Sequence, residues 1–282
     1  MALAFLLGCM GVAGAQEAQA KPVILVVSFG TSYNDSRDAT IGAIEADIQA
    51  AYPDWEVRRA FTAQTIIDIL KQRDGLEIDN VTQAMERLVA DGVKKVVIQP
   101  THIMHGYEYD DLVAETTPYA QQFEGFAIAE PLLSSFEDYQ AVIDALLSQN
   151  EQAGASDTAL VYMGHGTRHF ANAAYSQMQA MMQADGYENA FVGTVEGFPS
   201  VDNVLAAVSA YGAKKVVLAP FMIVAGDHAN NDMAGDEPDS WKSVFTQAGY
   251  EVDCVLEGLG QISAIRAIYA GHVRAAMQES GM

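Results

Sequence analysis

The sequence predicts an α/β fold with two similar lobes, each a mostly parallel sheet flanked by helices, and a binding cleft between the lobes. The first observation is that strand, turn and helix patterns alternate from residue 23 to the end of the chain. The second is an internal repeat, in which residues 92–100 match residues 212–220 almost residue for residue, and residues 26–31 resemble residues 162–167. Alternation of this kind predicts parallel sheets, and the repeat predicts a duplicated unit.

The expected organisation is a signal peptide at residues 1–20, an N-terminal lobe at residues 21–150 and a C-terminal lobe at residues 151–282. The first segment has an apolar core too short to span a bilayer, followed by small residues typical of a cleavage site, although it lacks the usual basic start. We therefore expect export to the periplasm, with lipidation at Cys9 as a lesser alternative. After cleavage only Cys254 remains, which excludes a disulfide within the chain.

The elements of the N-terminal lobe follow from hydrophobic periodicity. Residues 23–27 form a continuous β-branched run, typical of a strand that helices cover on both faces. Ile41, Ile44 and Ile48 recur at the spacing of one helix face. On this basis we expect strands at residues 23–27, 55–60 and 96–99, and helices at residues 35–51, 65–71 and 81–90. An inserted helix and a turn around Gly75 lengthen this lobe relative to its repeat.

A further strand at residues 126–130 and a helix at residues 136–150 lead to the second lobe. Residues 150–157 are polar, small and contain glycine, which favours a linker. The second lobe repeats the scheme, with strands expected at residues 159–163, 190–195, 216–224 and 249–256 and a final helix at residues 263–279.

Charge excludes some classes of partner. The formal net charge is -22 and the isoelectric point is near 4.4, whereas binding to nucleic acid needs clustered Lys and Arg. Anionic membrane surfaces are disfavoured for the same reason, and no segment is long enough to span a membrane. The loop at residues 28–32 lacks both a Walker lysine and a complete dinucleotide motif, which argues against nucleotide binding.

A histidine between two glycines is the first candidate site residue. Residues 159–163 form an apolar run that ends at Gly164, His165 and Gly166. Open α/β sheets place their ligand-binding loops where strands end. Flanking glycines leave the imidazole uncovered, so His165 is a candidate ligand or base.

Alignment of the two repeats adds two more candidates. It sets Phe29 opposite His165, Phe61 opposite Glu196, and Glu108 opposite His228. The three C-terminal residues each follow a predicted strand, so we expect them to converge at one sheet edge. Two imidazoles and a carboxylate suit a divalent transition metal and a proton acceptor beside it. The spacing alone also fits three unrelated polar residues.

Several separated motifs resemble the anaerobic sirohydrochlorin cobaltochelatases of cobalamin biosynthesis, the CbiK type. The resemblance covers residue 22 to the C-terminus and rests on Ser28-Phe29-Gly30-Thr31-Ser32, Gln99-Pro100-Thr101-His102-Ile103, Gly106 with Glu108-Tyr109, Gly164-His165-Gly166-Thr167, Val195-Glu196-Gly197, Pro220-Phe221-Met222 and Gly226-Asp227-His228-Ala229.

The resemblance implies an enzyme that inserts a divalent metal into a tetrapyrrole. The metal would be Co2+, with Fe2+ as the other candidate, and the tetrapyrrole would be sirohydrochlorin. His165, Glu196 and His228 match the family's metal-site positions and are the implied catalytic residues.

Histidine suits metal insertion because its neutral form coordinates metals and it exchanges protons near neutral pH. Glu196 would balance charge and accept a proton, and Glu108 could serve from the other lobe. The substrate's carboxylates would be repelled by an acidic protein, so local donors are needed. Arg168 is the first candidate and the loop with Ser28 and Thr31 is the second, while a surface salt bridge is the alternative role for Arg168.

Two rival classes of protein share these features. One is a periplasmic binding protein for tetrapyrrole, haem or metal without catalytic activity. The other is a metal-dependent hydrolase, in which the same residues would activate water.

His105 has no counterpart in the repeat, where Ala225 takes its place. A solvent-facing loop residue is the simplest interpretation. Alternatively, a homo-oligomer could present two His105 side chains to one haem b at a symmetric subunit interface, because histidine is a common ligand of haem iron.

Overall fold

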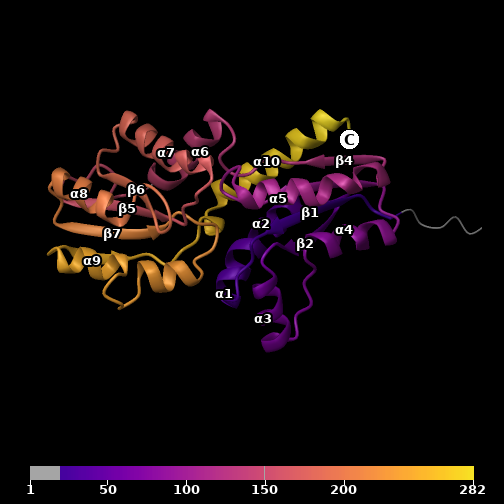
Figure 1. Ribbon diagram of the computed structural model, residues 1–282. Coiled ribbons are helices and arrows are strands. Elements are labelled where there is room, and N and C mark those ends of the chain that lie inside the picture. The colour runs from indigo at the N-terminus through magenta and orange to yellow at the C-terminus, as the bar shows by residue number, and fades with distance from the viewer. Residues whose placement is uncertain (1–19, 149) are drawn as a thin grey trace, which may run out of the picture.

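Two four-stranded parallel sheets form the frame of the protein (Figure 1). The computed structural model describes residues 20–148 and 150–282, so the expected signal peptide lies outside the described residues apart from Ala20. The order is β2-β1-β3-β4 in one sheet and β6-β5-β7-β8 in the other, which confirms the predicted duplication. The strands are β1 (Val23–Ser28), β2 (Glu56–Phe61), β3 (Lys95–Pro100), β4 (Gly125–Ile128), β5 (Thr158–Gly164), β6 (Ala190–Thr194), β7 (Lys215–Pro220) and β8 (Glu251–Cys254).

The central strands β1 and β5 are buried along their whole length, as expected for strands covered by helices on both faces. β7 ends at Pro220, four residues before the predicted limit, because the chain turns away there into the cleft segment. The inserted helix is α3, which ends at Gly75 with φ +68°. Figure 1 shows α3 projecting below the first sheet.

The helices pack on both faces of the sheets. Two of them begin with reciprocal side-chain caps, at Asn80 and Ser135, which satisfy the free amides of the first turn. The helices are α1 (Asn34–Arg37), α2 (Ala43–Ala51), α3 (Gln64–Asp74), α4 (Val81–Ala90), α5 (Tyr107–Thr116), α6 (Phe136–Leu147), α7 (Ala173–Ala184), α8 (Val201–Tyr211), α9 (Trp241–Gln247) and α10 (Ser263–Ser280).

Two helices cross between the lobes. α6 follows the last strand of the first sheet but packs on α7 of the second lobe, whereas α10 returns from the second lobe to lie on α2, β3 and β4 (Figure 1). One hydrophobic cluster therefore contains Ile24 from β1, Tyr162 from β5 and Tyr269 from α10. The expected division near residue 150 separates the two sheets, but the last helix belongs to the N-terminal lobe by its packing.

The sheet registers change one detail of the repeat alignment. Ser28 pairs with Phe61, and Gly164 pairs with Thr194, so the structural counterpart of Phe61 is Thr194. The predicted match of Phe61 with Glu196 was therefore wrong by two residues. Glu196 corresponds to Ala63, because the Ala63 amide donates to Phe29 O just as the Glu196 amide donates to His165 O. The gapless alignment missed a length difference between the lobes.

Among residues 20–148 and 150–282, no helix has the length and apolar character that crossing a bilayer requires.

Candidate functional site

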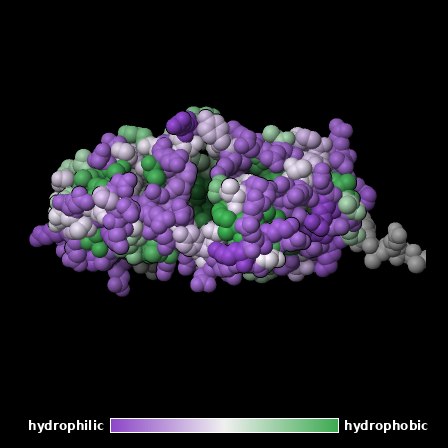
Figure 2. All heavy atoms as spheres, turned by 60° about the horizontal axis from the view of Figure 1, so that its bottom comes forward, coloured by the Kyte–Doolittle hydropathy of each residue, from purple (hydrophilic) through white to green (hydrophobic). Residues whose placement is uncertain are grey.

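A cleft with a volume of about 600 Å³ lies between the lobes. Figure 2 shows it as a hollow in which hydrophobic side chains are exposed. It opens where the strands of both sheets end, which is where parallel sheets bind ligands. Its lining includes seven residues singled out from the sequence: Ser28, Thr31, Glu108, His165, Arg168, Glu196 and His228.

The glycines beside His165 serve packing as well as access. A side chain at Gly164 would collide with the ring of Tyr175, whose hydroxyl accepts a hydrogen bond from the Gly166 amide at 3.3 Å. Gly166 has φ +85°, and a Cβ there would lie 2.6 Å from the Gly197 amide nitrogen. The turn is therefore closely packed against Tyr175 and Gly197, while the side chain of His165 is exposed to the cleft.

The tautomer of His165 follows from its backbone contact. Its Nδ1 lies 2.8 Å from Gly166 O, an acceptor, so Nδ1 carries the proton and donates it. The Nε2 lone pair of neutral His165 is then free to bind a metal.

His228 is held in the same tautomer by a carboxylate. Its Nδ1 lies 2.6 Å from Asp232 Oδ2, one helical turn farther along the chain. A carboxylate on one ring nitrogen fixes ring orientation and increases the basicity of the other nitrogen. This role of Asp232 was not predicted from the sequence.

The two imidazoles lie against each other. Their ring centroids are 4.6 Å apart with an interplanar angle of 83°. Glu196 is exposed and lines the same cleft, but no three His, Cys, Asp or Glu side chains in the described part of the chain converge closely enough to hold a metal. The folded chain thus offers a two-nitrogen site with a carboxylate nearby, and the predicted three-ligand set is not preassembled.

Glu108 faces this pair from the other lobe. It lies in the first turn of α5, a helix that the sequence analysis did not predict. Partial desolvation by the surrounding cleft walls raises the pKa of the half-exposed Glu108 carboxyl, although nearby His165 opposes this shift. A carboxylate with a raised pKa accepts a proton more readily.

Four residues were predicted to bind substrate, and besides Glu108 they are Ser28, Thr31 and Arg168, whose polar groups differ in their contacts. Arg168 is exposed and forms no ion pair within residues 20–148 and 150–282, so the alternative of a surface salt bridge is not observed. The Ser28 hydroxyl accepts a bond from the Thr101 hydroxyl at 2.8 Å. The Thr31 hydroxyl accepts one from the Tyr33 amide at 3.2 Å.

One more histidine, to which no role was assigned from the sequence, lies at the cleft. His102, only 8% exposed, lines the wall, and neither ring nitrogen has a hydrogen-bond partner within the described chain. Burial lowers its pKa to about 4. Its position just after the buried strand β3 was the available signal.

His169 joins the two lobes beside the cleft. Its Nδ1 accepts a hydrogen bond from the Ala171 amide at 3.2 Å. Its Nε2 lies 3.5 Å from Asp110 Oδ2, and its ring packs edge-on against Tyr107, with centroids 4.9 Å apart. Both of these partners belong to α5 of the opposite lobe.

Exposed aromatic rings give the cleft a surface suited to a flat ligand. Phe29 and Tyr107, which are 49% and 56% exposed, both line it. Large exposed apolar side chains that gather in one hollow mark a binding surface.

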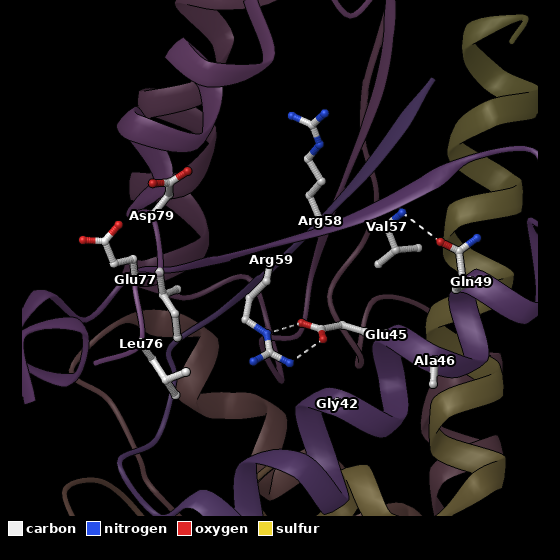
Figure 3. A pocket seen from close by; sticks show the side chains of 11 residues that line it. Gly42, Glu45, Ala46, Gln49, Val57, Arg58, Arg59, Leu76, Glu77 and Asp79 are labelled. Carbon is white, nitrogen blue, oxygen red and sulfur yellow. Dashed lines mark hydrogen bonds and ion pairs between the residues drawn. The ribbon is translucent and has the colours of Figure 1, made fainter. Parts of the chain in front are cut away.

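A second hollow, of about 580 Å³, lies outside the edge strand β2. Figure 3 shows Arg59 facing Glu45 and the Val57 amide facing Gln49. Arg59 donates to both carboxylate oxygens of Glu45 at 2.7 and 2.5 Å, and the Val57 amide donates to Gln49 Oε1 at 3.1 Å. These groups are paired with one another, so they cover part of the exposed edge of β2.

His105 lies outside the cleft lining. Its Nε2 is 2.5 Å from Glu130 Oε2, and its ring packs edge-on against Tyr109. The side chain is 40% exposed, so it remains accessible from solvent.

Comparison with known proteins gives a consistent result. Residues 22–278 match the family model described as cobalt chelatase (CbiK). A sirohydrochlorin cobaltochelatase from Salmonella typhimurium is 43% identical over 257 residues, covering 91% of this chain and 97% of that protein. The sirohydrochlorin cobaltochelatase CbiKC of Nitratidesulfovibrio vulgaris is 31% identical over 262 residues, covering 91% of each.

Solved structures share the fold. SirB from Bacillus subtilis with Fe3+ has a TM-score of 0.63 at 12% identity, covering 93% of this chain and 98% of that one. The sirohydrochlorin chelatase SirB in complex with cobalt, from Bacillus subtilis subspecies spizizenii, has a TM-score of 0.57 at 14% identity, with coverage of 93% and 97%.

Proposed function

The chain belongs to the cobalt chelatase (CbiK) family, and from this premise we propose that it inserts Co2+ into sirohydrochlorin, with Fe2+ as a second metal substrate. The observation that carries the proposal is the pair of imidazoles of His165 and His228, which use Nδ1 for their contacts within the described residues and so present Nε2 for metal binding. They lie in a cleft large enough and apolar enough for a macrocycle.

Metal insertion exchanges protons for a metal ion. Co2+ enters the ring as two pyrrole N–H bonds break, so the net products are the cobalt chelate and two protons. A site with two strong nitrogen ligands holds the ion but leaves its other coordination positions for the ring nitrogens. His165 and His228 would therefore deliver the metal without trapping it.

Glu108 and Glu196 are the proposed proton acceptors. Glu108 faces the histidine pair across the cleft, and its raised pKa suits proton uptake. Glu196 lines the same cleft and would balance the charge of the bound cation. Each carboxylate takes one pyrrole proton and releases it to solvent after the product leaves.

Arg168 is the proposed anchor for the carboxylates of the ring. A guanidinium can bind a carboxylate through two parallel hydrogen bonds. Ser28 and Thr31 would contribute at the opposite wall, where their hydroxyl groups border the cleft.

An absorbance assay with sirohydrochlorin and Co2+ tests the proposal. The wild-type protein should form the cobalt chelate, and His165→Ala and His228→Ala should each lower the rate by about 100-fold or more. His272→Gln, outside the cleft on α10, is the matched control and should keep the normal rate. Normal rates in both alanine variants would show that the metal site is elsewhere.

The same assay separates the rival classes. A binding protein would give a saturable spectral change without metallated product. A metal-dependent hydrolase would cleave ester substrates in the presence of Co2+ and leave sirohydrochlorin unchanged.

We also propose export to the periplasm, supported by the leader-like residues 1–20. N-terminal sequencing of protein from the native cell envelope should find that about 15 to 20 residues have been removed. Recovery of the intact chain from the cytoplasm would contradict this.

Haem b binding by His105 at a symmetric subunit interface is a separate proposal. It is supported by the exposure of the side chain outside the cleft, but Glu130 must release Nε2 for iron to bind there. Haem titration should then give a Soret band and a larger oligomer, both lost in His105→Ala. Wild-type protein that stays colourless with haem would rule this out.

A further inference from the structure

His102 is a buried imidazole that forms no hydrogen bond with any residue that the structure describes. It lies in the wall of the cleft just beyond β3, and both ring nitrogens are enclosed and unpaired within residues 20–148 and 150–282. A buried polar group in this state destabilises the fold, and in native proteins a catalytic role is one of the reasons for which such a group is retained. Its partner is therefore to be sought in the reaction rather than in the resting fold.

The nearest charged group is the carboxylate of Glu108. His102 Nε2 lies 3.6 Å from Glu108 Oε2, slightly beyond a hydrogen bond. The two side chains differ in exposure: that of His102 is 6% exposed and that of Glu108 is 51% exposed. Glu108 thus lies between the enclosed imidazole and the open cleft, where His165 faces it. Catalytic hydrogen bonds are often long in empty sites and shorten when substrate binds.

We propose that His102 is a positioning residue, whose neutral imidazole donates a hydrogen bond from Nε2 to Glu108 and aims that carboxylate at the pyrrole protons of the bound ring. The inference rests on the proposed chelatase function and adds to it the device that orients the proton acceptor. His102 keeps its own proton throughout, while the pyrrole proton moves to the outer oxygen of Glu108.

The protonation states fit this division of roles. Burial holds His102 neutral at physiological pH, so it does not compete for the pyrrole proton. The charges that act on Glu108 are His165 across the cleft and Asp111 one helical turn along α5. Of the basic groups in residues 20–148 and 150–282, His102 is the one whose nitrogen lies within 4 Å of this carboxylate, so it is the group placed to hold it.

The kinetic test compares two substitutions. His102→Leu removes the donor, whereas His102→Gln places an amide N–H where Nε2 stood. We expect His102→Leu to lower kcat about tenfold with little change in KM for either substrate, and His102→Gln to restore most of the rate. In the Glu108→Gln background, His102→Leu should change kcat by less than about twofold. An equal loss in both backgrounds would overturn the inference.

Two readouts do not depend on chelatase activity. Nitrogen-15 NMR of the metal-free protein should show His102 neutral, protonated at Nε2, with a signal that moves in Glu108→Gln. Protonation at Nδ1 without response to that variant would contradict the proposal. His102→Leu should also raise Tm by about 2 to 4 °C, because it removes an unpaired buried group.

The chelatase assay and the NMR spectrum separate a failure of the proposed function from a failure of the proposed role of His102. If wild-type protein formed no cobalt chelate, the proposed function would fail, and the NMR spectrum would still decide whether the Nε2 proton of His102 points at Glu108.

Discussion

At the level of single residues, the ability of the cleft to bind metal depends on which ring nitrogen of each histidine carries the proton. His165 is fixed by the carbonyl of Gly166, and His228 by the carboxylate of Asp232. A substitution cannot remove the Gly166 carbonyl that contacts His165, because it belongs to the backbone. The contact of His228, by contrast, depends on the side chain of Asp232. This makes Asp232 the more informative residue to change.

Asp232→Ala should weaken Co2+ binding about 10- to 100-fold, because His228 loses the partner that orients its ring and increases its basicity. Calorimetric titration with Co2+ in the absence of tetrapyrrole measures this directly. Asp236→Ala is the matched control, since it removes the same charge from the same loop at a side chain that pairs with Lys242. Equal losses in both variants would mean that the loop acts only through its overall charge.

Arg168→Ala should raise KM for sirohydrochlorin about tenfold, with a smaller effect on kcat. An increase of this size corresponds to the loss of roughly one charged hydrogen bond to the substrate. Initial rates over a range of substrate concentrations provide the measurement. Arg87→Ala serves as control, because Arg87 is paired with Asp79 on the first lobe and does not line the cleft. An unchanged KM in Arg168→Ala would assign the substrate carboxylates to other donors.

At the level of elements, the turn after β5 decides where His165 lies. Gly166 has φ +85°, and the backbone of Gly197 lies directly against it. The two turns after β5 and β6 therefore fit together only when this position has no side chain.

Gly166→Ala should abolish Co2+ binding and lower Tm, because the new methyl group pushes the two turns apart. Gly154→Ala is the control: it has a similar φ of +77° but open space around it. Backbone strain of about 1 to 2 kcal/mol is common to both. Thermal unfolding and Co2+ titration of both variants separate strain from collision, and equal effects would argue against the packing explanation.

The edge strands β2 and β6 share one side-chain contact that repeats in both lobes. Gln49 on α2 receives the Val57 amide of β2, and Gln179 on α7 receives the Val192 amide of β6 at 2.7 Å. An amide side chain that closes a sheet edge reduces pairing with other chains. The same device in both lobes suggests that it preceded the divergence of the sites.

At the level of the whole molecule, the exchange of α6 and α10 makes the lobes mutually dependent. The hydrophobic cluster that contains Ile24 of β1 and Tyr162 of β5 continues through Tyr269 of α10, so residues of both sheets and of the last helix share one core. The protein should then unfold as one unit.

The two tryptophans test this, because Trp55 precedes β2 and Trp241 begins α9. Trp55→Phe and Trp241→Phe each leave a fluorescent probe in one lobe. In urea unfolding, the fluorescence midpoint of each variant should coincide with the midpoint that circular dichroism gives for the same variant. This comparison removes any change in overall stability caused by the substitution itself. Separate midpoints would show independent lobes.

The sequence by itself determined the strands, the duplication and the cleft residues, because these depend on local periodicity and on motifs that survive in short segments. The continuous apolar runs inside β1 and β5 and the glycines around His165 can be recognised in the sequence without knowing which residues lie against them.

Only the tertiary structure decided the packing of α10 on the first lobe, the register that sets Glu196 opposite Ala63, the bond from His228 to Asp232 and the unpaired state of His102. An amphipathic helix has the same pattern whichever sheet it covers. The role of a polar side chain depends on neighbours that are distant in sequence, and folding alone brings those together.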